Sequence, residues 1–279
     1  MRYSDRLRQH DRATRYKQMQ SEVLHLKERL PPETITDIVH EVLQRVIAEH
    51  GTPPAPINHP SDRKVKALCY ALISDDPTEG AAFIHNIRDD GADLDAIYLN
   101  YLAEAATLLG TWWTTDHVTF HEVTIASSRI YAIIREYSHL FVPHRPVEVK
   151  SAVFAAVPGE IHTLGVLMAA DLFRKEGWRV DVKTGRPHDA LLAEITASPC
   201  RIVGLSAGGL HSAPALAQLV IALRISRPDL RIFLSGQITH EGSNVIKALG
   251  LDGVASDVKG ARDTLQQLWS QVATPATTG

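Results

Sequence analysis

Residues 149–184, VKSAVFAAVPGEIHTLGVLMAADLFRKEGWRVDVKT, contain the pattern that decides the fold. The apolar run VKSAVFAAV at the start is typical of a buried strand. A helix is expected over about 163–177, where apolar residues recur at helical spacing, and WRVDVKT at 178–184 is typical of a second strand. A strand, a helix and a strand in this order predict a βαβ unit with parallel strands.

The same alternation continues towards the end of the chain. Further strands are expected in RIVGLSAGG, RIFLSG and GVASD, and each is followed by residues of helical period. Five such units predict an α/β fold, a flavodoxin-like doubly wound parallel five-stranded sheet over residues 149–274. Ligands of open parallel sheets bind at the carboxyl ends of the strands, so the loops that follow the strands are the first candidates for a site.

Helical patterns precede the sheet. Residues 1–60 are expected to form a helical leader and linker, interpreted either as a solvated helix with a packing helix behind it or as an arm that docks a partner. GTPPAPINHPSD at 51–62 and VPHRPVE at 142–148 have the composition of linkers. Between them, four helical stretches predict a four-helix bundle cap over residues 61–143, namely KVKALCYALIS, EGAAFIHNIRDDG, LDAIYLNYLAEAATLLGTWW and FHEVTIASSRIYAIIREYSHLF.

Composition narrows the class of protein. The chain has 279 residues and a formal net charge of -3, so no global basic field favours nucleic acid. Its two cysteines form no CxxC pair, which argues against a disulfide framework or a thiolate zinc site. No apolar run approaches the length of a membrane span, and the polar N-terminus is unlike a signal peptide. We therefore expect a cytoplasmic protein with no membrane partner.

The loop GEIHTLG after the first expected strand carries the candidate chemistry. His162 lies between Gly159 and Gly165, and Glu160 stands two residues before it. A carboxylate at that spacing can accept the Nδ1–H of the imidazole, which leaves Nε2 free as a metal ligand or a base. Gly159 permits a tight turn, and Gly165 lets the start of the helix lie close to a flat or bulky ligand. The plain alternative is a polar loop histidine without a role.

The GExHxLG loop and the helix that ends in EGW resemble the cobalamin-binding domain family. VGLSAGGLHSAP at 203–214, FLSGQITHEG at 233–242 and ALGLDGVASDVKGA at 248–261 are similar, in the same order, to the other loops of that family. The resemblance implies that His162 is the lower ligand of cobalt and that a channel lined by small side chains holds the nucleotide tail. It further implies three roles: a tail-pocket wall for Ser206, a relay to Glu160 for Ser212, and room for the tail at Gly236.

The segment LLGTWWTTDHVTFHEVTIASSR at 108–129 is similar to the helical cap of that family. The resemblance implies that Trp113 covers the upper face of the corrin, although tryptophans that only fill the bundle core are the plain alternative. Val123 and Thr124 stand where related caps carry a Glu-His pair, and Glu160 replaces the more usual Asp. His117 and His121 lie nearby and can offer an upper ligand to cobalt, with an ordinary helix-surface position as the alternative.

A helical leader, a degenerate cap and a GExHxLG loop together resemble the AerR/PpaA antirepressors of photosynthetic bacteria. The resemblance implies a cobalamin-binding, light- and redox-responsive regulator that acts through a transcriptional repressor of the CrtJ/PpsR type. Hydroxo- or aquocobalamin is the expected form, and haem stays open as an alternative because imidazole also binds haem iron.

Enzymatic activity is not expected, because no separate catalytic constellation is found. Direct DNA contact is expected to be weak or absent, because residues 1–50 lack a helix-turn-helix with a basic recognition helix. The alternative function is a corrinoid carrier protein of a methyltransferase system.

Overall fold

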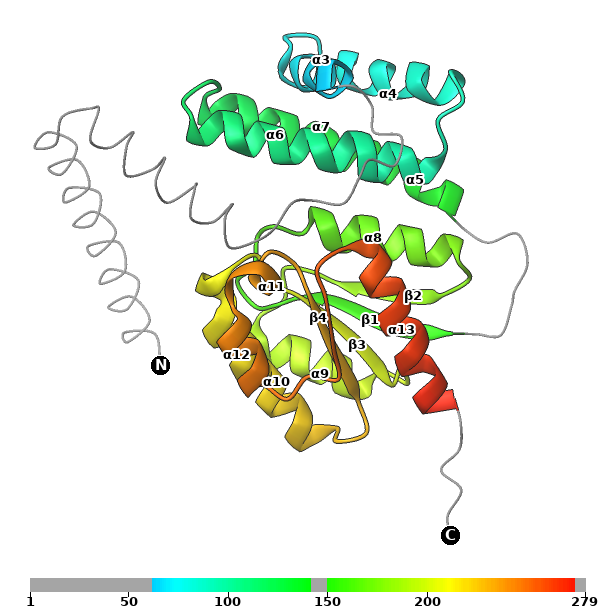
Figure 1. The fold of residues 1–279 in the computed structure, drawn as a ribbon, viewed down its shortest axis with the longest axis vertical. Helices are drawn as coiled ribbons and strands as arrows, with labels where there is room; N and C mark the ends of the chain where they lie inside the picture. Colours follow the sequence, from blue (N-terminus) through cyan, green and yellow to red (C-terminus); the bar gives the residue numbers. More distant parts are fainter. Residues whose placement is uncertain (1–61, 142–149, 274–279) are drawn as a thin grey trace, which may run out of the picture. The chain divides into compact units, whose positions relative to one another are not determined.

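The structure, a computed structural model, describes residues 62–141 and 150–273 (Figure 1). The predicted leader over 1–60, and the ends of all three predicted domains, lie outside the described residues. No described helix combines the length and the apolar character that crossing a bilayer requires. Residues 62–141 form a set of helices, and residues 150–273 form a sheet with helices packed on it.

Five parallel strands form one sheet in the order β2-β1-β3-β4-β5, as the alternation of apolar runs and helical patterns predicts. This order is that of flavodoxin-like folds, and it places the switch point between β1 and β3. Register is continuous across that point, since Ala156 of β1 pairs with Ser206 of β3 and Ser206 pairs with Ser235 of β4. The strands are β1 (Ser151–Ala156), β2 (Arg179–Lys183), β3 (Ile202–Ser206), β4 (Arg231–Ser235) and β5 (Gly253–Ala255).

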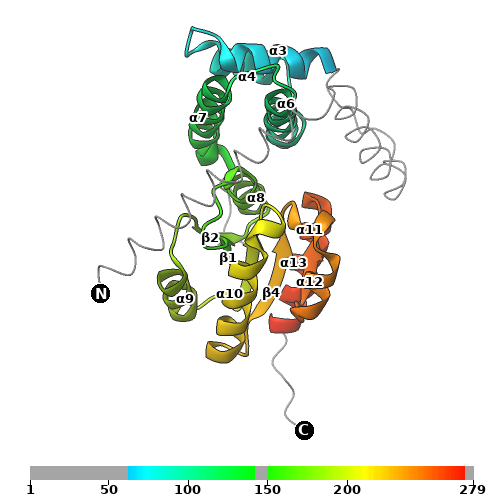
Figure 2. The same cartoon turned by 90° about the vertical axis from the view of Figure 1, so that its left-hand side faces the viewer.

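Helices cover both faces of the sheet (Figures 1 and 2). On one face, Val153, Val203 and Ile232 pack with apolar side chains of α9 and α10. On the other face, Phe154 and Phe233 pack with α8 and α13. The near-continuous burial of β1, β3 and β4 follows from this two-sided cover. The helices are α8 (Leu164–Lys175), α9 (His188–Ala197), α10 (Ala213–Ser226), α11 (Ile238–Glu241), α12 (Ser243–Ala248) and α13 (Val258–Ala273).

The predicted cap is present as four helical stretches. They are α3 (Asp62–Ile73), α4 (Glu79–Asp89), a stretch of α5 (Leu94–Ala96), a π-helical segment (Ile97–Leu102) and α6 (Ala103–Thr114), and then α7 (Phe120–Tyr137) with a 3-10 turn (Ser138–Phe141). Thr119 starts α7 with a capping box, because its hydroxyl accepts from the backbone N–H of Glu122 while the Glu122 carboxylate accepts from that of Thr119. The helical period does not predict the π-helical segment, which interrupts the expected helix at 97.

A buried polar contact joins the cap to α8. Tyr98, in the π-helical segment, donates from its hydroxyl to Asp171 at 2.9 Å, and Arg174 donates to the same carboxylate at 2.8 Å. Burial, together with the carboxylate beside it, raises the pKa of Tyr98 well above its usual range. Met168 and Leu172 of α8 belong to the same apolar core as the cap helices. The cap and α8 therefore share one apolar core, and the buried hydrogen bond between Tyr98 and Asp171 lies inside it.

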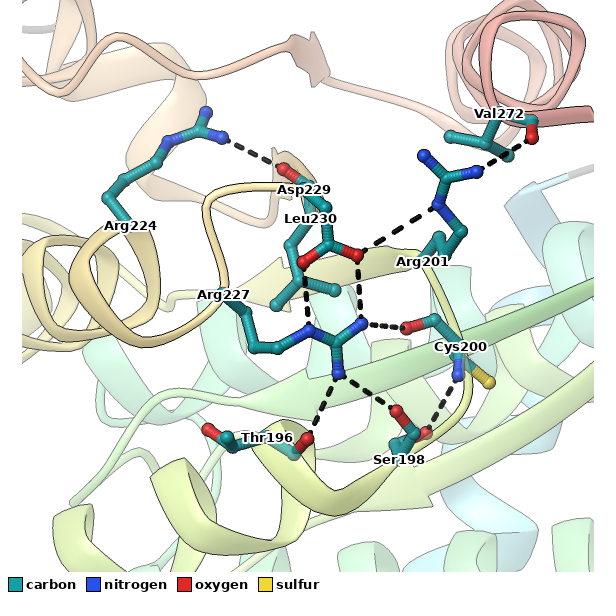
Figure 3. A network of polar contacts seen from close by, with 9 residues as sticks. All are labelled: Thr196, Ser198, Cys200, Arg201, Arg224, Arg227, Asp229, Leu230 and Val272. Atoms are coloured by element: carbon teal, nitrogen blue, oxygen red, sulfur yellow. Dashed lines mark hydrogen bonds and ion pairs between the residues drawn. The ribbon is translucent and has the colours of Figure 1, made fainter. Parts of the chain in front are cut away.

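An arginine network fixes the amino-terminal edge of the sheet (Figure 3). Arg227 donates to the carbonyls of Thr196 and Ser198, both at 3.0 Å, and binds the Asp229 carboxylate through two nitrogens. The carbonyls at the end of α9 thereby find donors, which helix ends otherwise lack. This network lies at the amino ends of the strands, whereas the loops that carry the candidate site follow the carboxyl ends.

Candidate functional site

The loop after β1 turns sharply and separates its two key side chains. Gly159 has φ of 84°, a conformation that favours glycine, and the N–H of Glu160 donates to the carbonyl of Val157 at 3.0 Å. The turn buries Glu160, which is 3% exposed, and leaves the side chain of His162 71% exposed. A buried carboxylate thus lies directly beneath an exposed imidazole.

Four hydrogen bonds converge on the Glu160 carboxylate. Oε1 accepts from the backbone N–H of His162 at 2.8 Å and from its Nδ1 at 2.7 Å. Oε2 accepts from the backbone N–H of Gly208 at 2.6 Å and from the hydroxyl of Ser212 at 2.8 Å. Burial alone raises the pKa of Glu160, but these donors outweigh it and lower the pKa to about 2. The group is therefore an anion at every physiological pH.

This anion orients the imidazole. Because a carboxylate can only accept, the Nδ1 of His162 carries the proton of the 2.7 Å bond. A neutral imidazole has one lone pair, which then lies on Nε2. The predicted arrangement of Ser212, Glu160 and His162 in one chain of hydrogen bonds is present, with Glu160 at its centre.

Gly208, which the sequence analysis did not single out, allows β3's loop to reach Glu160. A Cβ at this position would lie 2.6 Å from Oε2 and 3.0 Å from Cδ of Glu160. We expect Gly208→Ala to push the carboxylate away and to weaken binding of any ligand of His162 by about 10-fold or more, as other losses of support behind a metal-ligating histidine do. Titration of the purified variant measures the change. Gly260→Ala, where a Cβ makes only ordinary contacts, is the control.

An apolar cavity of about 530 Å³ opens above His162. Its floor includes Ile161 and His162 from the loop after β1, and its walls come from the cap helices α6 and α7. The hydroxyls of Thr124 and Ser128 in the wall donate to backbone carbonyls of α7, so they add little polarity. The cap residues of the lining are Ala106, Leu109, Gly110, Trp113, Phe120, Val123, Thr124, Ser127, Ser128, Ile130 and Tyr131.

The two tryptophans of the cap lie in different environments. Trp113 lines the cavity and is 48% exposed, whereas Trp112 packs in the cap with Tyr70. His117 lies against Trp112 at a ring distance of 4.8 Å, and neither it nor His121 lines the cavity. Both histidines are exposed, His121 on the surface of α7 as the alternative expects, and His117 in the loop between α6 and α7 rather than on a helix. The cavity has His162 on one side and mostly apolar groups on the other.

Ser206 lies in a different and much narrower space. It lines a cavity of about 30 Å³ between the sheet, α8 and α13, which has room for little more than a water molecule. Phe154, Phe173 and Phe233 line the same space with their rings, and the Cβ-free Gly204 makes room for the ring of Phe233. Three aromatic rings pack into this space, so the lining around Ser206 is not made of small side chains alone.

The two other predicted glycines differ in what they contact. Gly165 lies in the first turn of α8, and a Cβ there would meet nothing within 4 Å, so the helix surface is bare at this point. Gly236 follows β4 with φ of 100°, and a Cβ there would lie 2.4 Å from the carbonyl oxygen of Ala207. Gly236 therefore permits the loops after β3 and β4 to pack together. It lines neither cavity.

Two further residues of the site were not predicted. Tyr131 of α7 forms a 3.0 Å hydroxyl contact with Thr163, next to His162, which ties the cap to the loop. His211, in the 3-10 turn before α10, places Nε2 3.6 Å from Oε2 of Glu160. The histidine of VGLSAGGLHSAP was a visible signal for His211. Nothing in the sequence pairs Tyr131 with Thr163, since the contact depends on how α7 packs.

Comparison with known proteins finds a matching domain. Residues 150–265 match the family model described as the B12 binding domain. The matched residues span the sheet and include Glu160, His162 and Ser212. The fold, the order of loops and the anchored histidine agree with that match.

Two similar proteins extend the comparison beyond the domain. A Rhodobacter capsulatus protein, described as an uncharacterized 20.5 kDa protein in the bchF-crtJ intergenic region, is 25% identical over 162 residues, covering 57% of this chain and 84% of that protein. The monomethylamine corrinoid protein of Methanosarcina barkeri superposes with a TM-score of 0.62 at 13% identity, covering 74% of this chain and 97% of that one. That share exceeds the sheet domain by itself, so the likeness of fold extends into the cap.

Proposed function

We propose that this chain binds cobalamin between cap and sheet and acts as a regulatory protein rather than an enzyme. One observation carries the proposal. His162 presents a free Nε2 to an apolar cavity, while a buried anionic carboxylate holds its Nδ1. A neutral imidazole with a fixed tautomer is a good donor to cobalt, and an apolar cavity under Trp113 suits the face of a macrocycle.

The residues fit the group at the donor and at the cavity. Glu160, Ser212 and Gly208 would hold His162 in place, and Trp113 would cover the opposite side. When bound, cobalamin supplies a cobalt centre whose upper ligand is exchangeable, and we expect the hydroxo or aquo form. The fit is poorer at Ser206, where the narrow space must widen before a nucleotide tail can enter.

The regulatory part of the proposal rests on two supports. The R. capsulatus relative is named for a position next to crtJ, which favours a repressor of the CrtJ/PpsR type as the partner. Within the chain, Tyr131 and Thr163 link the cap to the loop of His162, so a ligand on that loop shifts what the cap presents to a partner. The protein would then act as an antirepressor in the cytoplasm, with direct DNA contact weak or absent.

The described cysteines do not favour thiol chemistry as the signal. Cys69 and Cys200 are both buried, and burial raises the pKa of Cys69 to about 12. A buried neutral thiol is a poor redox sensor. A response to redox state would therefore act through the bound metal centre.

Loading tests this function directly. The purified full chain is incubated with hydroxocobalamin in light and in darkness, desalted, and examined by absorption spectroscopy. The proposal expects a corrinoid spectrum and a shift in operator binding when the loaded protein is added to the repressor. Retention of corrinoid without any effect on the repressor would refute the antirepressor role while leaving cobalamin binding intact. A haem spectrum after growth with both cofactors would favour the haem alternative.

A corrinoid carrier of a methyltransferase system is the second candidate, favoured by the fold match to the M. barkeri corrinoid protein. Val123 and Thr124 argue against a carrier, because they stand where related caps carry a Glu-His pair. Val123 is apolar, and the hydroxyl of Thr124 donates to a backbone carbonyl of α7. The two candidates separate in one assay. Formation of a methyl–cobalt spectrum with a donor methyltransferase would support the carrier.

The narrow space at Ser206 should limit the rate at which complete cobalamin associates. We expect Phe233→Leu to speed association of complete cobalamin several-fold, because a smaller side chain removes part of the barrier to entry of the tail. A corrinoid that lacks the nucleotide tail should bind the wild type and the variant at equal rates. Phe141→Leu, a buried phenylalanine of the cap outside this space, controls for the stability loss of about 1 kcal/mol or more that core truncation brings. Stopped-flow absorbance measures the rates.

A further inference from the structure

A second imidazole shares the carboxylate that orients His162. The Nε2 of His211 lies 3.6 Å from Oε2 of Glu160, and the Nδ1 of His162 lies 2.7 Å from Oε1. One ligand atom from each of the three residues falls within 4.8 Å of the others. His211 is 64% exposed at its side chain, so an ion from solvent can reach the cluster.

The composition of this cluster is that of a zinc site. Two imidazoles and one carboxylate, with an open position, are a recurring protein ligand set for Zn²⁺. The carboxylate of Glu241 also lies near Gly209, where a Cβ would be 3.2 Å from His211 Nδ1 and 3.4 Å from Glu241 Oε2.

We propose that the corrinoid-free protein binds one Zn²⁺ between His162, His211 and Glu160. The ion takes the place of the Nδ1 proton of His162, which faces the carboxylate, and also binds Nε2 of His211. Each neutral imidazole then binds zinc through the nitrogen facing Glu160 and carries its proton on the other nitrogen, so no net proton leaves the rings. Gly208 and Ser212 continue to donate to Oε2, and the ion bridges the loops after β1 and β3.

The zinc form excludes a ligand on Nε2 of His162. A neutral imidazole has one lone pair, so a ring that gives it to zinc at Nδ1 carries a proton at Nε2. Zinc and a corrinoid therefore compete for one histidine. This competition rests on the proposed function, whereas the zinc site itself does not. Through His211, the corrinoid-free protein would hold zinc and would have its own defined arrangement of the loops after β1 and β3.

Equilibrium binding tests the site with the untagged full chain. The chain has 14 histidines, some outside the described residues, so wild type is compared with single variants. Isothermal titration with ZnCl₂ is combined with Co²⁺ as a spectroscopic probe, whose visible absorption reports nitrogen and oxygen ligands. Zinc binding and corrinoid binding are both measured on each variant, and we expect His211→Ala to weaken zinc binding at least tenfold. His162→Ala should weaken both, and His121→Ala, a surface histidine of the cap, should change neither.

The outcomes separate this inference from the proposed function. Zinc binding of equal strength in wild type and His211→Ala would overturn the site, whatever the corrinoid does. Saturating zinc that leaves the apparent corrinoid affinity of wild type unchanged would overturn the competition. A protein that binds zinc through His211 but takes up no corrinoid would keep the zinc site and remove the cobalamin proposal.

Discussion

Replacing His162 with alanine is expected to abolish retention of corrinoid on desalting, with affinity reduced by at least about 100-fold. Loss of supporting residues behind a ligating histidine already costs about 10- to 100-fold, and loss of the donor itself removes more. The fold should survive. Glu160 keeps three of its donors in the variant, the backbone N–H groups of residues 162 and 208 and the hydroxyl of Ser212. The thermal midpoint and near-ultraviolet circular dichroism check this.

Two comparisons make the result specific to the imidazole. His117→Ala should retain corrinoid as wild type does, because that ring lies against Trp112 outside the cavity. Free imidazole added to the His162→Ala protein should restore part of the corrinoid binding and its spectrum, which a merely structural role would not allow. Unchanged uptake by His162→Ala would sink the ligand assignment.

The arrangement of strands and helices was predictable because it is written in local periodicity. Buried strands of β1, β3 and β4 are short apolar runs, and each is followed by a helix of amphipathic or apolar period. The pairing of Glu160 with His162 was equally accessible, since two residues in one turn are near each other wherever the turn lies. Local signals therefore fixed the fold class and the centre of the site.

The remaining parts of the site depend on packing between distant segments. Gly208 and His211 reach Glu160 across about 50 residues of sequence, at separations that carry no period. The three phenylalanines around Ser206 each fit an ordinary core pattern, and only the close approach of β1, β4 and α8 brings their rings into one space. The π-helical segment at 97–102 likewise has no local pattern that predicts it, although it holds Tyr98 against Asp171. Such contacts are decided by tertiary structure rather than propensity.

Replacing Glu160 with glutamine should separate charge from shape at the centre of the site. Four donors converge on the two carboxylate oxygens, and an amide NH₂ would turn a donor towards donors. We expect the variant to lose about 1–3 kcal/mol of unfolding free energy at pH 7, the scale of hydrogen bonds to a charged group. Corrinoid affinity should fall about 10- to 100-fold, because His162 loses the partner that fixes its tautomer.

The contribution of Glu160 to the free energy of unfolding depends on pH. The folded-state pKa of Glu160 is about 2, below its ordinary value of 4.5, so the unfolded chain binds the proton more readily. The stability from Glu160 is therefore complete above about pH 4.5 and is lost as pH falls towards 2. Urea unfolding of wild type and Glu160→Gln should differ most at neutral pH, and the difference should shrink below about pH 4. Glu241→Gln, an exposed carboxylate near the same loop, should show no such trend. A difference between wild type and Glu160→Gln that stays constant from pH 7 to pH 3 would mean that the carboxylate is held by shape alone, and the anionic anchor of His162 would have to be abandoned.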